Sequence, residues 1–244
     1  MNKEEEEAAG FNYPPRGRRL RTYPEMADRV LRACFPYYSL LSAKYRKRFV
    51  ERVIAFLNFH YIDGGEGLVV TDEMAIRIAA AQVRMSLGLR SPLLTAFPQI
   101  IVYEASYYSP FTKSYNKGET NSRGIIVLSW KYFDEGFSDP SDGLNLAYHE
   151  FAHAIVAQYT RYSYGGWTFD SAFQELSRAI AEDHIDRKAR EAGLFREYAF
   201  TNKMEFFAVA TEEFFENPEE ISKYCPALFR IFCRLYRQDP LKPL

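Results

Sequence analysis

Hydrophobic positions repeat with helical spacing near the start of this chain and give way to strand-like runs in its middle. Apolar side chains recur three and four residues apart in segments 24–34 and 42–60, and again after Thr71, a favourable helix cap. Two β-branched runs, residues 99–103 and 124–130, are bounded by turn-forming residues. This part of the chain therefore predicts three helices and two strands.

The remaining segments predict loops and then a long helical half. Residues 63–67 are rich in glycine and predict a loop, and residues 106–123 predict a loop or an irregular hairpin. After Asp139 the pattern is helical, over roughly residues 142–161, 171–192, 202–216 and 226–238. The first of these helices has Ser141 or Asp142 as its expected N-cap. A small sheet followed by a helical half is typical of an α+β fold.

Length and composition predict one main domain. The chain has 244 residues, of which 47% are hydrophobic, and this is enough for a large core. Residues 1–22 carry an acidic run followed by an arginine-rich stretch and predict a flexible segment. Residues 23–244 contain no linker and predict a single domain. The net charge of −1 gives no reason to expect direct binding of nucleic acid.

No feature of the sequence predicts export or membrane insertion. The N-terminus is acidic and no apolar signal region follows it. No run reaches the roughly 18 apolar residues of a membrane span. Cys34, Cys225 and Cys233 are odd in number and widely spaced, as in proteins whose thiols stay reduced. We therefore expect a cytoplasmic protein.

Residues 149–153, His-Glu-Phe-Ala-His, carry the most specific chemical signal. On a helix, residues four apart lie one turn above each other, so His149 and His153 can bind one metal ion. Glu150 lies on the adjacent edge, where a carboxylate can take a proton from water. The surrounding segment 145–158 is almost wholly apolar and predicts burial. Since unpaired buried polar groups cost on the order of 1–3 kcal/mol each, a metal site is favoured over an exposed polar stretch.

A zinc site that performs hydrolysis needs a third protein ligand and one open position. The motif does not continue to a third histidine, because Val156 and Tyr159 occupy the positions where glycine and histidine would stand. His60 and His184 are possible ligands, although both are more simply interpreted as ordinary polar residues. A downstream glutamate is the other common choice.

Two glutamates compete for this role. Glu175 follows His153 by twenty-two residues, close to the spacing of thermolysin-type enzymes, but its neighbours predict a solvated face. Glu205 opens an otherwise apolar helix, where an ionised carboxylate is tolerable only beside a cation. Its alternative role is a capping box with Asn202. We favour Glu205 as the ligand, and Glu212, two turns later, as a residue that orients a ligand.

Several segments together resemble the Mlc titration factor A family of zinc peptidases, which are of the gluzincin type and distantly similar to the anthrax lethal factor catalytic domain. The similarity runs from about residue 35 to the C-terminus and includes segments 124–130, 142–153, 205–215 and 238–241. It implies a zincin-like fold and one Zn²⁺ per chain. Positions 155–156 and 164–167 depart from the family pattern, so the rim of the cleft is expected to differ.

The resemblance also assigns roles to residues. It implies zinc ligation by His149, His153 and Glu205, with Glu150 as the general base. It further implies that Tyr198, seven residues before Glu205, donates to the oxyanion of the tetrahedral intermediate. We therefore expect a zinc-dependent peptidase with aminopeptidase-like activity and a low basal rate.

The expected partner is a peptide or protein substrate. One of the two β-branched runs, 99–103 or 124–130, is expected to offer a sheet edge along which an extended peptide adds as a strand. The alternative function is a regulatory protein that sequesters a transcriptional repressor such as Mlc, with zinc in a mainly structural role. Glu150 favours an enzyme, because a general base is not needed to hold a fold together.

Overall fold

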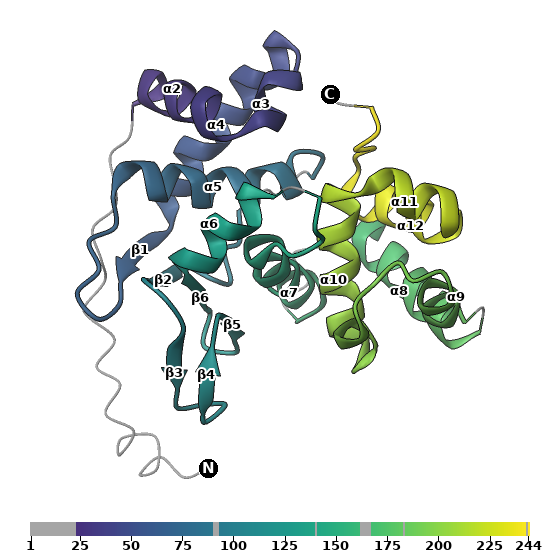
Figure 1. The fold of residues 1–244 in the computed structure, drawn as a ribbon. Helices are drawn as coiled ribbons and strands as arrows, with labels where there is room; N and C mark the ends of the chain where they lie inside the picture. Colours follow the sequence, from purple (N-terminus) through teal and green to yellow (C-terminus); the bar gives the residue numbers. More distant parts are fainter. Residues whose placement is uncertain (1–22, 90–92, 140, 162–166, 183, 243) are drawn as a thin grey trace.

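The structure is a computed structural model that describes residues 23–89, 93–139, 141–161, 167–182, 184–242 and 244. The segment 1–22, predicted to be flexible, and the departing positions 164–166 lie outside the described residues. Figure 1 shows a small sheet on one side of the molecule and a group of helices on the other. The α+β layout predicted from the sequence is confirmed.

Helices make up most of the chain. The first half contains α2 (Pro24–Cys34), α3 (Pro36–Leu40), α4 (Ala43–Phe59), α5 (Asp72–Ser86) and α6 (Trp130–Ser138). The second half contains α7 (Leu146–Arg161), α8 (Trp167–Ala181), α9 (Ile185–Glu191), the 3-10 helix η1 (Glu197–Phe200), α10 (Lys203–Glu216), α11 (Pro218–Tyr224) and α12 (Pro226–Tyr236). None of the described helices is both long and apolar enough to cross a membrane.

The predicted helices are confirmed with one exception. The helix expected over residues 171–192 is two helices, α8 and α9. His184, which precedes α9, has a left-handed backbone with a φ of 49°. A right-handed helix cannot continue through such a residue. The short helices α3, α6 and α11 were not predicted.

The main sheet has four strands in the order β1 (Tyr61–Gly64), β2 (Gln99–Tyr103), β6 (Ile125–Ser129) and β5 (Gly118–Asn121). β1, β2 and β6 are parallel, and β5 runs antiparallel to β6. A separate hairpin is formed by β3 (Tyr107–Ser109) and β4 (Ser114–Asn116). The irregular hairpin expected within residues 106–123 is thus present, but part of that segment also joins the main sheet.

The two predicted strands are confirmed as β2 and β6, but the prediction that one of them offers a sheet edge is wrong. β2 lies between β1 and β6, and β6 lies between β2 and β5. β1 begins two residues before the predicted glycine-rich loop, and β5 lies in the predicted irregular segment. The short polar sequence of β5, Gly-Glu-Thr-Asn, lacks the apolar alternation from which a strand is predicted.

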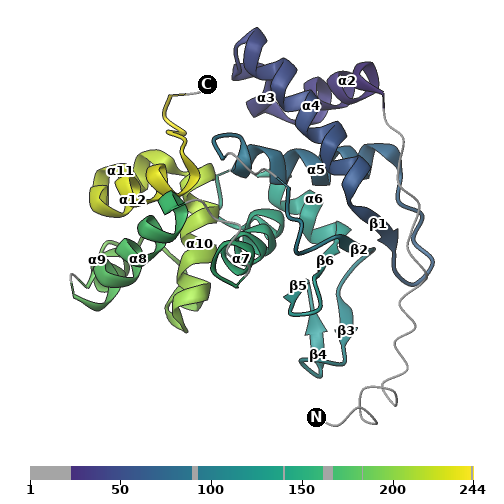
Figure 2. The ribbon, with the colours of Figure 1, turned by 180° about the vertical axis from the view of Figure 1, so that it is seen from behind.

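The two faces of the sheet pack differently. Ile100, Val102, Ile126 and Leu128 point into the main hydrophobic core, which also contains residues of α2 to α12. The residues between them, Ile101, Ile125 and Val127, form a second cluster with Tyr103 and with Tyr107 of β3. Figures 1 and 2 show α7 between the sheet and α10, and α7 contacts β5, β6 and α10. α7 is therefore packed against the sheet on one side and against α10 on the other.

The start of α7 is fixed by Asn145, which is buried. Its Oδ1 accepts a hydrogen bond of 3.1 Å from the backbone N–H of Tyr148, as an N-cap does. Its Nδ2 donates to the carbonyl oxygen of Gly136 at 3.1 Å and to Oε1 of Glu216 at 2.9 Å. One side chain therefore caps α7 and ties it to α6 and α10.

The prediction that Ser141 or Asp142 caps the N-terminus of α7 is wrong. Ser141 donates its hydroxyl hydrogen to Asp139, and Asp142 accepts from the backbone N–H of Leu144, both in an exposed loop before the helix. Three residues separate Asp142 from Leu146, the first helical residue of α7. The sequence signal for a cap was strong at positions 141 and 142, but the contacts available in the buried interior select Asn145.

We predict that Asn145→Ala lowers the free energy of unfolding by roughly 2–3 kcal/mol, because it removes the cap and leaves Glu216 without its buried donor. Urea denaturation followed by circular dichroism measures this change. The matched control is Ser141→Ala, which should stay within about 0.5 kcal/mol of the unchanged protein. Equal effects of the two substitutions would contradict the assignment of Asn145 as the cap.

Candidate metal centre

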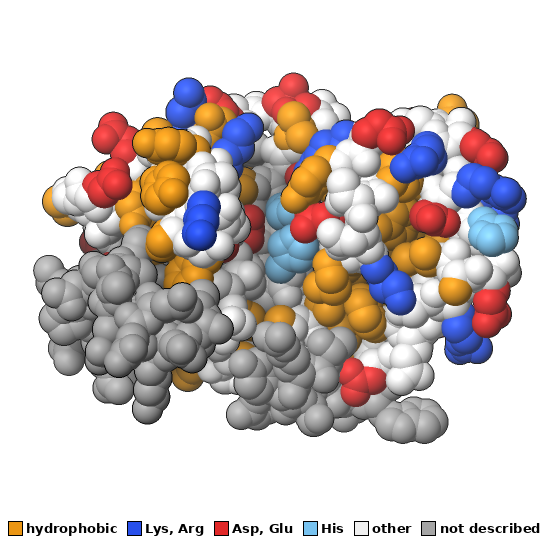
Figure 3. Space-filling view, turned by 90° about the horizontal axis from the view of Figure 1, so that it is seen from below, with side chains coloured by type: hydrophobic (Ala, Val, Ile, Leu, Met, Phe, Trp, Pro, Cys, Tyr) orange, Lys and Arg blue, Asp and Glu red, His pale blue; other side chains and the backbone are white. Residues whose placement is uncertain are grey.

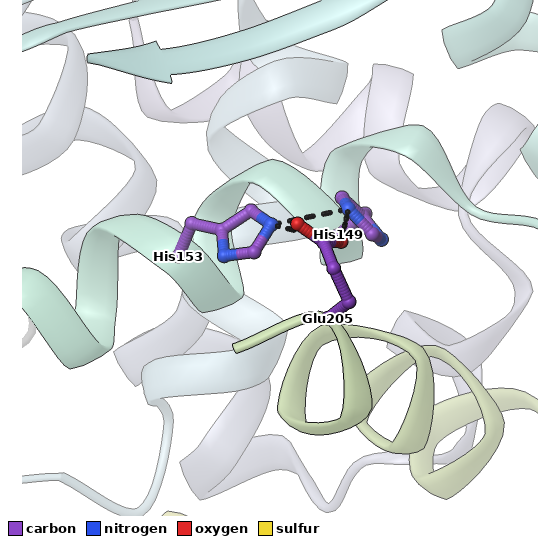
Figure 4. Close-up of side chains that lie close together, drawn as sticks. All are labelled: His149, His153 and Glu205. Carbon is purple, nitrogen blue, oxygen red and sulfur yellow. Dashed lines mark hydrogen bonds and ion pairs between the residues drawn. The ribbon is translucent and has the colours of Figure 1, made fainter. Parts of the chain in front are cut away.

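Two helices bring together His149, His153 and Glu205. The histidines lie on α7 and Glu205 in the first turn of α10. Nε2 of His149 is 3.1 Å from Nε2 of His153 and 3.1 Å from Oε2 of Glu205, and Nε2 of His153 is 3.6 Å from the same oxygen. Figure 4 shows the three side chains pointing toward one another. In the part of the chain that the structure describes, this is the one group of three such side chains whose ligand atoms lie within 4.8 Å of one another.

The spacing and chemistry of this group fit a zinc ion. Ligand atoms bonded at about 2.0–2.1 Å to a tetrahedral zinc lie about 3.3 Å from one another. The distances between the three ligand atoms, 3.1, 3.1 and 3.6 Å, are close to that value. Oε2 of Glu205 is buried and accepts no aligned hydrogen bond from the described residues. A buried carboxylate oxygen without a donor is costly unless a cation binds it, and two imidazoles with one carboxylate form a donor set typical of zinc enzymes.

The charges of the site also favour a cation. Burial alone would raise the pKa of Glu205, but the imidazoles of His149 and His153 outweigh it and lower the pKa far below its ordinary value. Burial alone would lower the pKa of His149, but Glu205 and Glu212 outweigh it and raise the pKa to about 10. Glu205 is therefore ionised at neutral pH. A metal ion that binds His149 must displace a proton, so metal binding weakens as the pH falls.

The other residues considered as ligands lie away from this group. Glu175 on α8 forms an ion pair with Arg234 of α12. His60 is buried, with its Nδ1 3.0 Å from the carbonyl oxygen of Phe56. His184 precedes α9 at an exposed position. Of the four candidates raised by the sequence, Glu205 alone joins the two histidines.

The capping role considered for Glu205 belongs to its neighbour. Oδ1 of Asn202 accepts hydrogen bonds from the backbone N–H groups of Met204 at 2.9 Å and Glu205 at 3.0 Å, so Asn202 caps α10. The carboxylate of Glu205 instead lies against the imidazoles of α7. The cap fixes the first turn of α10 and thereby the position from which Glu205 reaches the site.

Glu150 is placed beside the candidate metal ligands and is contacted by the edge strand β5. It is 5% exposed, and its Oε2 lies 2.9 Å from the hydroxyl oxygen of Thr120, which donates to it. A Cβ atom on Gly118 would lie 2.6 Å from Oε1 of Glu150 and 2.8 Å from its Cγ, so any larger residue at this position of β5 would displace the Glu150 side chain. Burial raises the pKa of Glu150. A carboxylate with a raised pKa is a better proton acceptor than an exposed one.

Tyr198 reaches the site from η1. Half of its side chain is exposed, and its ring centroid lies 6.1 Å from that of His149. Burial raises the pKa of Tyr198 to about 12, and the negative charge of Glu205 adds to this effect. The hydroxyl therefore keeps its proton at neutral pH and can donate a hydrogen bond into the cleft.

The buried carboxylate of Glu212 contacts His149 on the side of the imidazole that faces away from Glu205. Oε1 of Glu212 accepts from Nδ1 of His149 at 2.8 Å, as the position of Glu212 on α10 led us to expect. The same oxygen accepts from Nη2 of Arg196 at 2.6 Å, and Oε2 accepts from the backbone N–H of Asn145 at 2.8 Å. Arg196 also donates from Nη1 to the carbonyl oxygen of Gly143 at 2.7 Å. Such a carboxylate fixes the orientation of a ligating imidazole and raises its basicity.

These groups open into a cleft of about 1210 Å³. One wall is formed by β4 and β5, and the other by η1, the start of α10 and part of α8. Figure 3 shows histidine side chains at the bottom of a hollow in this face of the molecule. A cleft of this size holds several residues of an extended peptide, which is more than a small molecule requires.

Three residues of the site escaped sequence analysis: Gly118, Thr120 and Arg196. Gly118 and Thr120 belong to a short polar strand that gave no strand signal, and their contacts with Glu150 join positions some thirty residues apart. Arg196 is an isolated arginine in a segment without a motif. The one sequence signal for Arg196 is its position two residues before Tyr198.

Comparison with known proteins identifies the family of this chain. The family model described as glucose-regulated metallo-peptidase M90 matches residues 15–237. The Mlc titration factor A proteins of Yersinia pestis (strain Pestoides F) and Yersinia pseudotuberculosis (serotype O:1b, strain IP 31758) are each 30% identical to this chain over 206 residues, which cover 73% of this chain and 72% of each relative. The resemblance found from the sequence motifs is confirmed. The chain therefore belongs to the Mlc titration factor A family of M90 metallopeptidases.

Proposed function

We propose that this protein is a zinc-dependent peptidase with a zincin-like fold of the gluzincin type. The observation that carries the proposal is the convergence of His149, His153 and Glu205 beside the buried carboxylate of Glu150. His149, His153 and Glu205 would hold one zinc ion per chain. Glu150 is not needed to bind the metal, and its place in the wall of the cleft favours a catalytic role.

A zinc ion bound there supplies a Lewis acid for the peptide carbonyl and lowers the pKa of water to about 7. Glu150 accepts the proton of the attacking water and later delivers it to the leaving amine. Thr120 donates to Oε2 of Glu150 and so orients the carboxylate for both transfers. Tyr198 donates its hydroxyl hydrogen to the oxyanion that develops on the substrate. Glu212 holds the imidazole of His149 in a single orientation.

The substrate is a peptide bound in an extended conformation along β5. This strand is at the end of the sheet, and all four of its residues line the cleft. Backbone groups of an edge strand can form hydrogen bonds with an added strand, and these bonds give affinity for a peptide whatever its side chains are. The family resemblance supports aminopeptidase-like activity in the cytoplasm.

A second candidate function is favoured by the name of the relatives, Mlc titration factor A. In that case the protein would bind a transcriptional repressor such as Mlc, and zinc would serve the structure. The two functions can coexist in one chain. They differ in their need for Glu150, because repressor binding does not require a proton acceptor in the cleft.

We predict that Glu150→Gln lowers peptide turnover by roughly 10²–10⁴, the usual contribution of a general base, and leaves zinc content unchanged. Turnover of a peptide library, measured with and without a chelator and paired with metal analysis of the same samples, tests this. Hydrolysis by the unchanged protein should stop on chelation. Full turnover in the zinc-loaded variant would remove Glu150 from the mechanism and favour the regulatory function.

A second prediction concerns Tyr198→Phe. We expect kcat to fall by roughly 10²–10³, because the substitution removes one hydrogen-bond donor to the oxyanion. KM and zinc content should change little, because the aromatic ring is kept. Because the side chain is half-exposed, the substitution should leave the fold intact. Steady-state kinetics, zinc analysis and thermal denaturation of one preparation check the three properties together. A variant that loses its metal or its stability would show that Tyr198 is a structural residue.

A further inference from the structure

The β3–β4 hairpin presents an exposed aromatic pair at the cleft. Tyr108 and Tyr115 lie directly opposite each other in the hairpin register, and their ring centroids are 5.6 Å apart in an edge-to-face arrangement. Tyr108 is 50% exposed and Tyr115 is 76% exposed. Tyr115 lines the cleft, together with its neighbours Ser114 and Asn116. Tyr115 therefore stands in the wall of the site that holds the proposed catalytic groups, and Tyr108 packs beside it.

The opposite face of the hairpin is anchored to the sheet. Tyr107 is buried and stacks on Tyr103 of β2 with ring centroids 4.6 Å apart. Oε2 of Glu119 on β5 accepts from the hydroxyl of Ser109 at 2.5 Å and from Nδ2 of Asn116 at 3.3 Å. A two-stranded hairpin is at best marginally stable alone, so these contacts keep it in one position. The exposed tyrosines are thus held in place by a rigid support.

An ordered aromatic side chain that is largely exposed in the wall of a cleft is suited to bind an apolar group. Tyrosine presents a large contact area with few rotatable bonds, so binding costs little conformational entropy. Tyr108 supports the ring of Tyr115 from the side and restricts it further.

We propose that Tyr115, supported by Tyr108, is a subsite for a large apolar or aromatic side chain of an extended peptide. This inference rests on the proposed peptidase function and names the substrate class more narrowly. Gly118 and Thr120 lie against Glu150, and Tyr115 precedes them by three and five residues. Lys117 is a bend between β4 and β5, so the roughly 10–16 Å that an extended chain spans over that number of residues is the upper limit of the separation. The subsite thus binds a side chain within about five residues of the reacting bond.

The test uses the full-length, zinc-loaded Glu150→Gln protein, which is expected to bind peptides and to cleave them roughly 10²–10⁴ times more slowly than the unchanged protein. Serine-based decapeptides that carry one phenylalanine at each position in turn are titrated by calorimetry. At one position, phenylalanine should strengthen binding by roughly 3- to 10-fold over serine. Adding Tyr115→Ala should remove this preference, and Tyr115→Phe should keep it. The control is Tyr224→Ala, which removes a tyrosine of similar exposure, 49%, on α11 and should change nothing.

The proposal is overturned if phenylalanine strengthens binding at no position of the peptide. It is also overturned if the preference for phenylalanine survives Tyr115→Ala. Cleavage sites determined by mass spectrometry with the unchanged protein form a separate arm. Cleavage at one fixed distance from the preferred phenylalanine, within about five residues of it, supports the subsite. Cleavage without dependence on Tyr115 rejects the subsite and leaves the peptidase function standing. Binding that depends on Tyr115, without cleavage by zinc-loaded protein, rejects the peptidase function and keeps the binding surface.

Discussion

The rest of this structure depends on one constraint, the approach of two imidazole nitrogens and one carboxylate oxygen between α7 and α10. Three such groups, with the further carboxylate of Glu212 behind them, are unfavourable in a protein interior unless a cation joins them. α7 and α10 must therefore pack closely, and small buried residues such as Ala152 and Ala208 are compatible with that approach. Metal binding and the packing of these helices stabilise each other.

The two walls of the cleft are each tied to α7 by a separate set of hydrogen bonds. On the sheet side, Thr120 of β5 donates to Glu150. On the helical side, Arg196 donates to Glu212, which accepts from His149, and η1 with Tyr198 begins directly after Arg196. The proposed proton acceptor, Glu150, is thus oriented by the strand on which a peptide is expected to lie. The proposed oxyanion donor, Tyr198, follows a residue of the same network that orients His149, a proposed metal ligand.

The sequence predicted those parts of the site that depend on short-range geometry. The spacing of His149 and His153 places them on one helical face wherever the helix lies, and the apolar neighbours of Glu205 made its burial predictable. Asn145 and Thr120 act through partners far away in the chain, so no local pattern identified them. The left-handed backbone at His184 also has no local signal, because histidine is not a typical helix breaker. Tertiary contacts decided the roles of Asn145 and Thr120.

Zinc retention tests the central claim most directly, when measured side by side on Glu205→Gln and Glu175→Gln after dialysis against a mild chelator. Oε2 of Glu205 lies 3.1 Å from His149, whereas Glu175 pairs with Arg234 on another surface. Glu175→Gln should keep about one zinc per chain, and Glu205→Gln should keep almost none, because two imidazoles alone bind zinc weakly. Full zinc retention by Glu205→Gln, or loss of zinc from Glu175→Gln alone, would contradict the account.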